Sequence, residues 1–383
     1  MAKLSDDLKQ KMLSILDELE SNVSQVKFAA KRKLNVLEPV KIMPYYGFAS
    51  DNYVYLKGRV LEREKIKNPK EVDTLHEQWL NMWKRMESDE IPGAKLKAWF
   101  GDKEIDIETD EEGYFQVEIH ADGKINFEKH GRRIKLQLQD QYTDKDEKDA
   151  EGYLFVPGEN AEFGVISDMD DTVLVSHVKD FMGRMRLMLK KNATERSPFP
   201  GIAGFLRALQ KGKDGKGHNP IFFVSGSEWN LYDLLVSFLK YHKIPEGPLL
   251  LRDRGTTWDR GKYETSEEEY KREKIRHILD TYPELKFICI GDSGQHDPET
   301  YQKIVEEYPG RILGIYIRDV TPDKRDKEVK EIARKVKEQG TEMLLAEETY
   351  AAAKHAAKMG WINESQLEDV KRTRDEDEKQ DES

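Results

Sequence analysis

The sequence has one cysteine, no long apolar run and no excess of basic residues, and each of these absences excludes a class of protein. Cys289 is the single cysteine, so neither an intrachain disulfide nor a Cys-x-x-Cys zinc site can form. No apolar stretch approaches the roughly 18 residues of a membrane-spanning helix. We therefore expect a soluble chain in a reducing cytoplasm, where a contact with membrane would be peripheral.

The charge balance argues against a nucleic-acid partner. The chain carries 63 lysines and arginines against 74 aspartates and glutamates, which gives a net charge of −11 over 383 residues. A phosphate backbone attracts a basic surface, and this composition does not supply one. The length leaves room for two or three domains, and the sequence leaves the oligomeric state unknown.

The pattern of the chain changes three times, which predicts four regions. Residues 1–39 form an amphipathic helical segment, residues 40–160 a β-rich, sandwich-like domain with a helical insert, residues 161–362 a catalytic domain, and residues 363–383 a charged, disordered tail. The β-rich region contains alternating segments such as "YVYLKGRVLE", "KLKAWF", "YFQVEIH" and "RRIKLQLQD". It contains no catalytic constellation, so we expect it to pack or to recognise a protein partner.

The catalytic region alternates short apolar runs with helix-length segments. The runs "FGVI", "IFFV", "KFICI" and "RILGIYI" are each separated by a segment long enough for a helix. This alternation is typical of an α/β fold with a parallel sheet flanked by helices.

Polar chemistry gathers at the ends of three of these predicted strands. "FGVI" runs into "SDMDDT", which contains Asp168 and Asp170, "IFFV" runs into Ser225-Gly226-Ser227, and "FICI" runs into Gly291-Asp292, with Asp297 close behind. Ligands of an open parallel sheet bind beyond the carboxyl ends of its strands, so we expect these side chains to meet.

Carboxylates held this close need a cation to remain ionised. Mg²⁺ suits them best, because it takes hard oxygen ligands and leaves positions for water and a substrate phosphate. A carboxylate beside such an ion and a bound phosphoryl group can attack phosphorus, and a second one two residues on can act as acid and base. An acidic surface loop is the plainer alternative for each motif taken alone.

These motifs resemble the haloacid-dehalogenase-type phosphohydrolases, with their Asp-x-Asp-x-Thr and Gly-Asp-x-x-x-x-Asp motifs. Within that superfamily, "SDMDDTV", "RSPFPGIAGFLRAL", "NPIFFVSGSEWNLYDLL", "GPLLLRDRG" and "FICIGDSGQHDPETY" are similar to the actin-patch-associated phosphatidate phosphatase family and its bacterial relatives. The resemblance covers residues 161–361 and implies a Rossmann-like catalytic domain with a small helical cap.

The resemblance implies a role for each matching residue. Asp168 would be the nucleophile and Asp170 the acid/base. Ser225 and Gly226 would hold the phosphoryl oxygens. The remaining implied residues are Thr172, which would brace the first loop near the phosphate, a phosphate-binding lysine at Lys271 or Lys274, and Mg²⁺ ligands at Asp168, Asp170 (main chain), Asp292 and Asp297.

The substrate implied by the resemblance is phosphatidate, which is hydrolysed through an aspartyl-phosphate intermediate. A basic helix with an apolar stripe, expected at residues 179–196, would suit a substrate presented at a lipid surface, although the same stripe could simply pack onto the domain. A soluble phosphomonoester, or a non-catalytic scaffold with a relic phosphatase core, remains an alternative.

Overall fold

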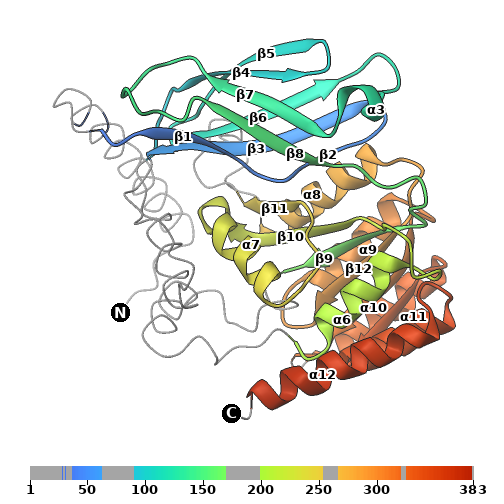
Figure 1. Ribbon diagram of the computed structural model, residues 1–383. Helices are drawn as coiled ribbons and strands as arrows, with labels where there is room; N and C mark the ends of the chain where they lie inside the picture. Colours follow the sequence, from blue (N-terminus) through green and yellow to red (C-terminus); the bar gives the residue numbers. More distant parts are fainter. Residues whose placement is uncertain are drawn as a thin grey trace, which may run out of the picture. The chain divides into compact units, whose positions relative to one another are not determined.

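The computed structural model describes Phe28, Lys31 and residues 37–62, 90–169, 199–252, 266–320 and 325–381. The described chain divides into two compact units. Residues 37–62 and 90–155 belong to the first unit, and the remaining described residues from Val156 onward belong to the second. Figure 1 shows a unit built mainly of strands and a unit in which helices surround a sheet.

The first unit is a largely antiparallel sheet. Hydrogen bonds connect its strands in the order β1-β3-β2-β8-β7-β4-β5, with β6 paired to β3. The early part of β8 pairs with β7, and its end pairs with β2, so one strand joins two groups of strands. The elements are β1 (Val40–Pro44), β2 (Gly47–Ala49), β3 (Tyr53–Glu62), β4 (Lys95–Phe100), β5 (Lys103–Glu108), β6 (Tyr114–His120), α3 (Phe127–His130), β7 (Arg133–Leu138) and β8 (Asp149–Phe155).

The predicted strands of this unit are confirmed where their sequences alternate. "YVYLKGRVLE" is β3 and "KLKAWF" is β4, in which the buried Leu96, Ala98 and Phe100 alternate with more exposed residues. Because the strands form a single hydrogen-bonded network, the sandwich-like arrangement stays a prediction. The helical insert is expected at residues 64–92, of which residues 64–89 lie outside the described residues.

The second unit is built on a six-stranded parallel sheet, as the alternating pattern predicts. Its strand order is β11-β10-β9-β12-β13-β14. Numbered along the chain, this is the order 3-2-1-4-5-6 of doubly wound folds. The strands are β9 (Gly164–Asp168), β10 (Ile221–Glu228), β11 (Leu249–Arg252), β12 (Phe287–Asp292), β13 (Ile312–Arg318) and β14 (Glu342–Ala346).

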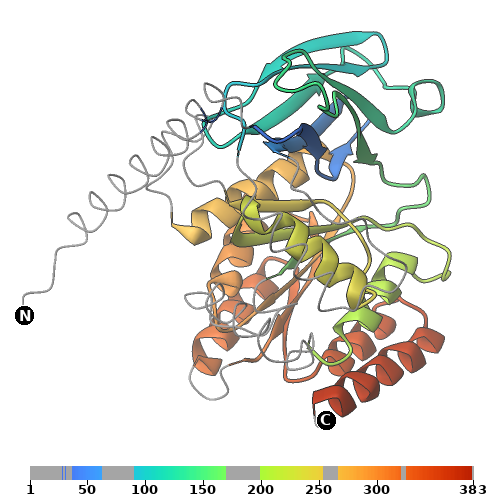
Figure 2. The same ribbon diagram turned by 60° about the vertical axis from the view of Figure 1, so that its left-hand side comes forward.

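Helices follow the strands and cover the sheet (Figures 1 and 2). Helices α8, α9 and α10 form one contiguous layer, whereas α6, α11 and α12 contact one another in a second group. The elements are α6 (Ile202–Lys211), η2 (Trp229–Leu231), α7 (Tyr232–Tyr241), α8 (Glu267–Thr281), α9 (Asp297–Glu307), α10 (Asp326–Glu338), α11 (Thr349–Lys358), η3 (Glu364–Gln366) and α12 (Leu367–Asp381). Because it is covered in this way, the sheet has strands such as β9 and β12 that are buried along their whole length.

The prediction that residues 363–383 are disordered was wrong for most of that segment. Residues 367–381 form α12, which packs on α6. Val370 is fully buried, Arg207 of α6 pairs with Asp369 at 3.2 Å, and the amide of Gly201 donates to Asp377 Oδ2 at 2.9 Å. A narrow stripe that faces α6 stabilises the helix despite its high charge. No helix of the described chain is long and apolar enough to cross a membrane.

Candidate active site

The candidate site lies where the sheet reverses its direction of winding. Asp168 ends β9 and Asp292 ends β12, and these two strands are neighbours in the centre of the sheet. Successive strands are added on one side from β9 to β11 and on the other from β12 to β14, which makes the β9/β12 boundary the topological switch point. The site is therefore at the position where doubly wound sheets bind ligands.

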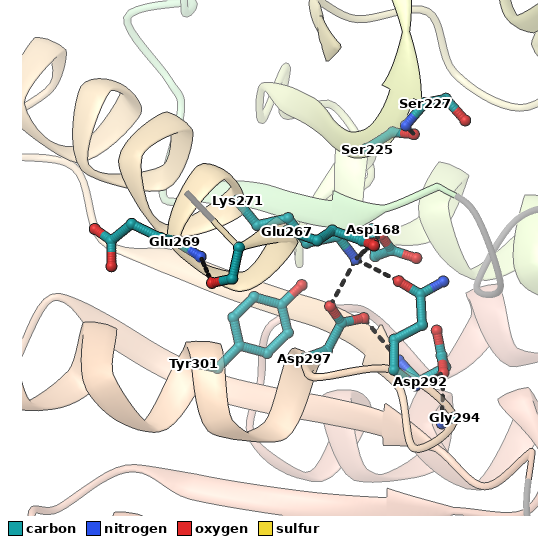
Figure 3. A network of polar contacts seen from close by, with 12 residues as sticks. Asp168, Ser225, Ser227, Glu267, Glu269, Lys271, Asp292, Gly294, Asp297 and Tyr301 are labelled. Atoms are coloured by element: carbon teal, nitrogen blue, oxygen red, sulfur yellow. Dashed lines mark hydrogen bonds and ion pairs between the residues drawn. The ribbon is translucent and has the colours of Figure 1, made fainter. Parts of the chain in front are cut away.

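Lys271 of α8 contacts the carboxylates of both Asp168 and Asp297 (Figure 3). Its ammonium Nζ lies 2.6 Å from Asp168 Oδ1 and 2.9 Å from Asp297 Oδ1, and it donates to Gln295 Oε1 at 2.8 Å. Asp168 and Asp297 are each 1% exposed and Lys271 is 4% exposed. A buried charge is tolerated only when it is paired and hydrogen-bonded. Here the ammonium of Lys271 pairs with the carboxylates of both Asp168 and Asp297.

The local sequence explains why Lys271 reaches the site. Ser266 caps α8 by accepting the Glu269 amide at 3.2 Å, which fixes where the helix begins. Lys271 then lies in the second turn, with its side chain directed to the sheet. The ammonium of Lys274, the other predicted candidate, instead lies 5.0 Å from the centre of the Tyr270 ring. The geometry thus favours Lys271.

The Gly-Asp-x-x-x-x-Asp motif folds into a loop closed by its own two aspartates. Asp292 Oδ1 accepts the amides of Gly294 at 2.6 Å and Gln295 at 3.0 Å, as in an Asx-turn. Asp297 Oδ2 accepts the Asp292 amide at 3.1 Å. A Cβ atom at Gly291 would lie 2.5 Å from that Oδ2 atom, so only glycine leaves space for the Asp297 carboxylate.

Arg325, at the start of α10, holds the same loop from outside. Its Nη1 donates to the carbonyls of Ser293 at 3.0 Å and Gln295 at 2.5 Å, and its Nη2 pairs with Glu299. Two carbonyl contacts and an ion pair fix both the position and the orientation of the guanidinium. Arg325 therefore restrains the backbone that carries Asp292 and Asp297.

Ser225 and Gly226 lie on the other side of Asp168, in the second half of β10 and just beyond its pairing with β9. Val224 is the residue opposite Asp168 in the β9–β10 register, so Ser225 follows the strand pair directly. Ser225 is buried, and its Oγ accepts the Ser227 amide at 2.9 Å (Figure 3). A Cβ atom at Gly226 would lie 2.8 Å from the carboxylate of Glu267, so a larger residue there would have to displace that side chain.

Three of the four predicted metal ligands are brought together. One oxygen from each of Asp168, Asp292 and Asp297 can be chosen so that all lie within 4.8 Å of one another, and all three residues are buried. Hard carboxylate oxygens at this spacing fit a small divalent cation such as Mg²⁺. Three buried carboxylates beside the single ammonium of Lys271 also carry excess negative charge that a cation would offset.

Several predicted residues lie outside the described chain. These are Asp170, Thr172 and the helix expected at residues 179–196, which would have formed the cap. Conversely, Gln295 and Arg325 belong to the site but were not predicted. Gln295 sits inside the last motif, which was the one available signal for it. Arg325 follows no motif and is brought there by the fold alone.

Cys289 has no part in this chemistry. It lies in the buried strand β12, and burial raises the pKa of its thiol, with a further contribution from the negative charge of Asp297. The thiol therefore stays protonated at neutral pH.

Comparison with known proteins shows what this part of the chain is similar to. Residues 163–319 match a family model described as "Phosphatidate phosphatase APP1, catalytic domain". The described residues of the matched segment lie within the second unit. The match includes Asp168, Ser225, Lys271, Asp292 and Asp297.

Two fungal relatives share the same part of the chain. Phosphatidate phosphatase APP1 of Saccharomyces cerevisiae is 31% identical over 158 residues, and an uncharacterised protein of Schizosaccharomyces pombe is 25% identical over 229 residues. The matches cover 40% and 57% of this chain, but 25% and 35% of the two relatives.

Among solved structures, a carbohydrate acetylesterase from Xanthomonas citri aligns with a TM-score of 0.24 at 10% identity, over 76% of this chain and 72% of its own. That similarity is too low to assign a fold. Membership of the haloacid-dehalogenase superfamily stays a prediction from the sequence.

Proposed function

We propose that this chain is a Mg²⁺-dependent phosphatase that hydrolyses a phosphate monoester through an aspartyl-phosphate intermediate. The observation that carries the proposal is the buried group formed by Asp168, Lys271 and Asp297 beside Asp292, inside the segment that matches a phosphatase catalytic domain. A non-catalytic scaffold would not need these buried charged residues, and each of them costs stability unless it is paired. The intact set favours an active enzyme over a relic scaffold.

In the proposed mechanism, a carboxylate oxygen of Asp168 attacks phosphorus, and the bond from phosphorus to the ester oxygen breaks. Asp170 donates its proton to the departing alkoxide and later takes a proton from the water that attacks the aspartyl phosphate. The second attack releases inorganic phosphate and restores the Asp168 carboxylate. Thr172, which follows closely on Asp170, would brace this loop near the phosphate.

Lys271, Ser225 and Gly226 would stabilise the transferring group. The ammonium of Lys271 already touches Asp168, so it would lie beside the phosphoryl oxygens and neutralise part of their charge. Ser225 and the backbone at Gly226 end the neighbouring strand and would donate hydrogen bonds from the opposite side. Asp297 orients Lys271 and the Asp292 loop through its two oxygens.

Asp168, Asp292 and Asp297, with the main chain of Asp170, would hold the Mg²⁺ ion. When bound, the ion would offset negative charge on the carboxylates and on the phosphoryl group. Asp292 Oδ1 accepts two amides of its own loop, which fixes the orientation of the carboxylate for this role.

Phosphatidate is the proposed substrate, supported by the family description and by the relative in Saccharomyces cerevisiae. The helix predicted at residues 179–196 would then face the lipid surface, which remains a prediction from its sequence.

The test is Mg²⁺-dependent phosphate release from phosphatidate in mixed micelles, beside a panel of soluble phosphomonoesters. Release from phosphatidate supports the lipid assignment. Release from the soluble esters alone would keep the phosphatase and reject the lipid substrate. No release from any ester would reject the phosphatase and leave a scaffold.

A further inference from the structure

Arg318 brings a positive charge to the site from a third strand. It ends β13 and is the direct partner of Asp292 in the β12–β13 register, and the Ser293 amide donates to its carbonyl at 2.8 Å. Paired residues of neighbouring strands project from the same face of a sheet, and the strands lie about 4.8 Å apart. Arg318 therefore leaves the sheet next to Asp292, on the same face and at the same carboxyl edge.

The guanidinium of Arg318 has a buried donor without a hydrogen-bond partner. Its Nη1 atom is inaccessible to solvent and meets no acceptor among the residues that the structure describes. The great majority of buried donors are paired, so an unpaired one calls for an explanation. Burial lowers the pKa of Arg318 to about 9, against the opposing effect of the Asp292 charge, and the group stays cationic at neutral pH.

The known neighbours of Arg318 do not explain this donor. The ring of Phe199 lies against the guanidinium, but a stacked ring occupies its face and leaves the in-plane N–H groups available. The Oδ1 atom of Asp292 is engaged by the amides of Gly294 and Gln295. Asp319, the next residue, accepts from Ser293 Oγ at 3.2 Å.

We infer that Arg318 binds an anionic oxygen of the phosphomonoester and helps to determine which substrates are accepted. The inference rests on the proposed function. The ends of β10, β9, β12 and β13 place Ser225, Asp168, Asp292 and Arg318 in a row, so Arg318 closes the side of the site opposite Ser225. Two strand spacings separate it from Asp168, about 10 Å between backbones, a span that a long arginine side chain and a bound phosphate can bridge.

The anionic oxygen can belong to either of two parts of the substrate. It belongs either to the transferring phosphoryl group or to a second negatively charged group in the alcohol portion. A planar guanidinium suits both, because it offers paired N–H donors at the spacing of phosphate or carboxylate oxygens.

The test compares Arg318→Met and Arg318→Lys with the wild type, and with Arg334→Met as a control on the exposed face of α10. Calorimetry measures the binding of inorganic phosphate, and steady-state kinetics measures KM and kcat on esters whose alcohol portion is neutral or negatively charged. We expect Arg318→Met to weaken phosphate binding at least tenfold, with a smaller loss in Arg318→Lys and none in Arg334→Met. Arg318→Lys keeps the charge and serves if the methionine variant does not fold.

The pattern of losses identifies the source of the oxygen. If Arg318→Met binds phosphate more weakly and has a higher KM on every ester, then Arg318 binds an oxygen of the transferring phosphoryl group. A loss confined to esters with a charged alcohol portion, with phosphate binding unchanged, assigns it to the second group. A variant that only lowers Tm, with phosphate binding and every KM unchanged, would show that Arg318 merely packs on Phe199 and would overturn the inference.

The same experiment separates this inference from the proposed function. A wild type that binds phosphate through Arg318 but hydrolyses no ester would reject the phosphatase and keep the anion site. A wild type that hydrolyses esters equally well with and without Arg318 would reject the inference alone. A wild type that neither binds phosphate nor hydrolyses esters would reject both.

Discussion

Replacing Lys271 by methionine should damage both the stability and the activity of this chain. The variant keeps the length and the apolar stem of the side chain but removes the ammonium. That ammonium lies within 2.9 Å of one oxygen on each of two buried carboxylates, those of Asp168 and Asp297, and also donates to Gln295. Without it, and in the absence of Mg²⁺, two buried negative charges face each other with no cation between them.

The magnitude follows from the burial of the pair. Removing one partner of a buried ion pair costs about 3–5 kcal/mol, because the remaining charge is left uncompensated. In a domain of roughly 200 residues, 1 kcal/mol changes Tm by about 2–4 °C, so we expect Tm to fall by about 6–20 °C.

Thermal unfolding without added Mg²⁺ and phosphate release with Mg²⁺ provide the measurements. Lys274→Met is the matched control, one helical turn further along α8. Its ammonium lies over the Tyr270 ring, a contact worth about 0.5–1 kcal/mol at an exposed site. We expect this control to keep its activity, whereas Lys271→Met loses at least about a hundredfold, the scale of one lost electrostatic donor.

Equal effects of the two substitutions would refute this reasoning. So would a Lys271→Met variant with normal Tm but no activity, because the buried charges would then be neutralised by something other than Lys271. A variant with low Tm but normal turnover would remove Lys271 from the proposed chemistry and leave it a structural role.

Three further predictions follow from the site and its surroundings. Mg²⁺ at a hundred times its Kd should stabilise the wild type by about 2.7 kcal/mol, which is measured as a higher Tm. Asp292→Asn should lose most of that rise in Tm, and an equal rise in both proteins would count against Asp292 as a ligand. Arg325→Gln should lower kcat at least tenfold by freeing the loop that it clamps, with its fold checked by circular dichroism, and unchanged kcat would show that the clamp is dispensable. Burial lowers the pKa of His242 and His277 to about 4, below the ordinary value near 6.5 of the unfolded chain. The unfolded chain thus binds more protons, so stability is full above about pH 6.5 and falls by roughly 1–3 kcal/mol per histidine as pH drops towards 4; a double glutamine variant with the same slope of Tm against pH would contradict this.

The sequence predicted the catalytic sheet because each of its strands is a short apolar run bounded by polar residues. It also predicted that Asp168, Asp292 and Asp297 would gather, since parallel strands end at one edge. The sequence left two candidates for the phosphate-binding lysine, Lys271 and Lys274, which lie within one helical turn of each other. Only the direction of the two side chains from α8 distinguishes them, and that depends on how the helix packs.

Other parts of the site depend on contacts between segments far apart in the chain. Arg325 reaches the loop across 30 residues, and no local pattern marks it. In the sequence, Arg318 is simply the charged residue at the end of an apolar strand. Its position beside Asp292 and its buried donor without a hydrogen-bond partner follow only from the folded structure.

Helix α12 was predicted as disordered because charges dominate its composition. The helix is instead stabilised by a single stripe containing Val370, which packs against Gly204 of α6, and by the pair formed by Arg207 and Asp369. A Cβ atom at Gly204 would lie 2.9 Å from the Val370 Cα, so the two helices approach closely there. The overall composition of the segment does not show such a stripe, because a few buried positions are outnumbered by charged ones.

The most direct test of the central claim is phosphate release by the wild type and by Asp168→Asn, on phosphatidate and on soluble phosphomonoesters. The substitution keeps the size of the side chain and removes the attacking carboxylate, so we expect a normal folded spectrum and no phosphate release. Release by the wild type that is lost in Asp168→Asn would support Asp168 as the nucleophile. Wild-type rates in the variant would contradict the mechanism, because the phosphoryl group would then be transferred without Asp168.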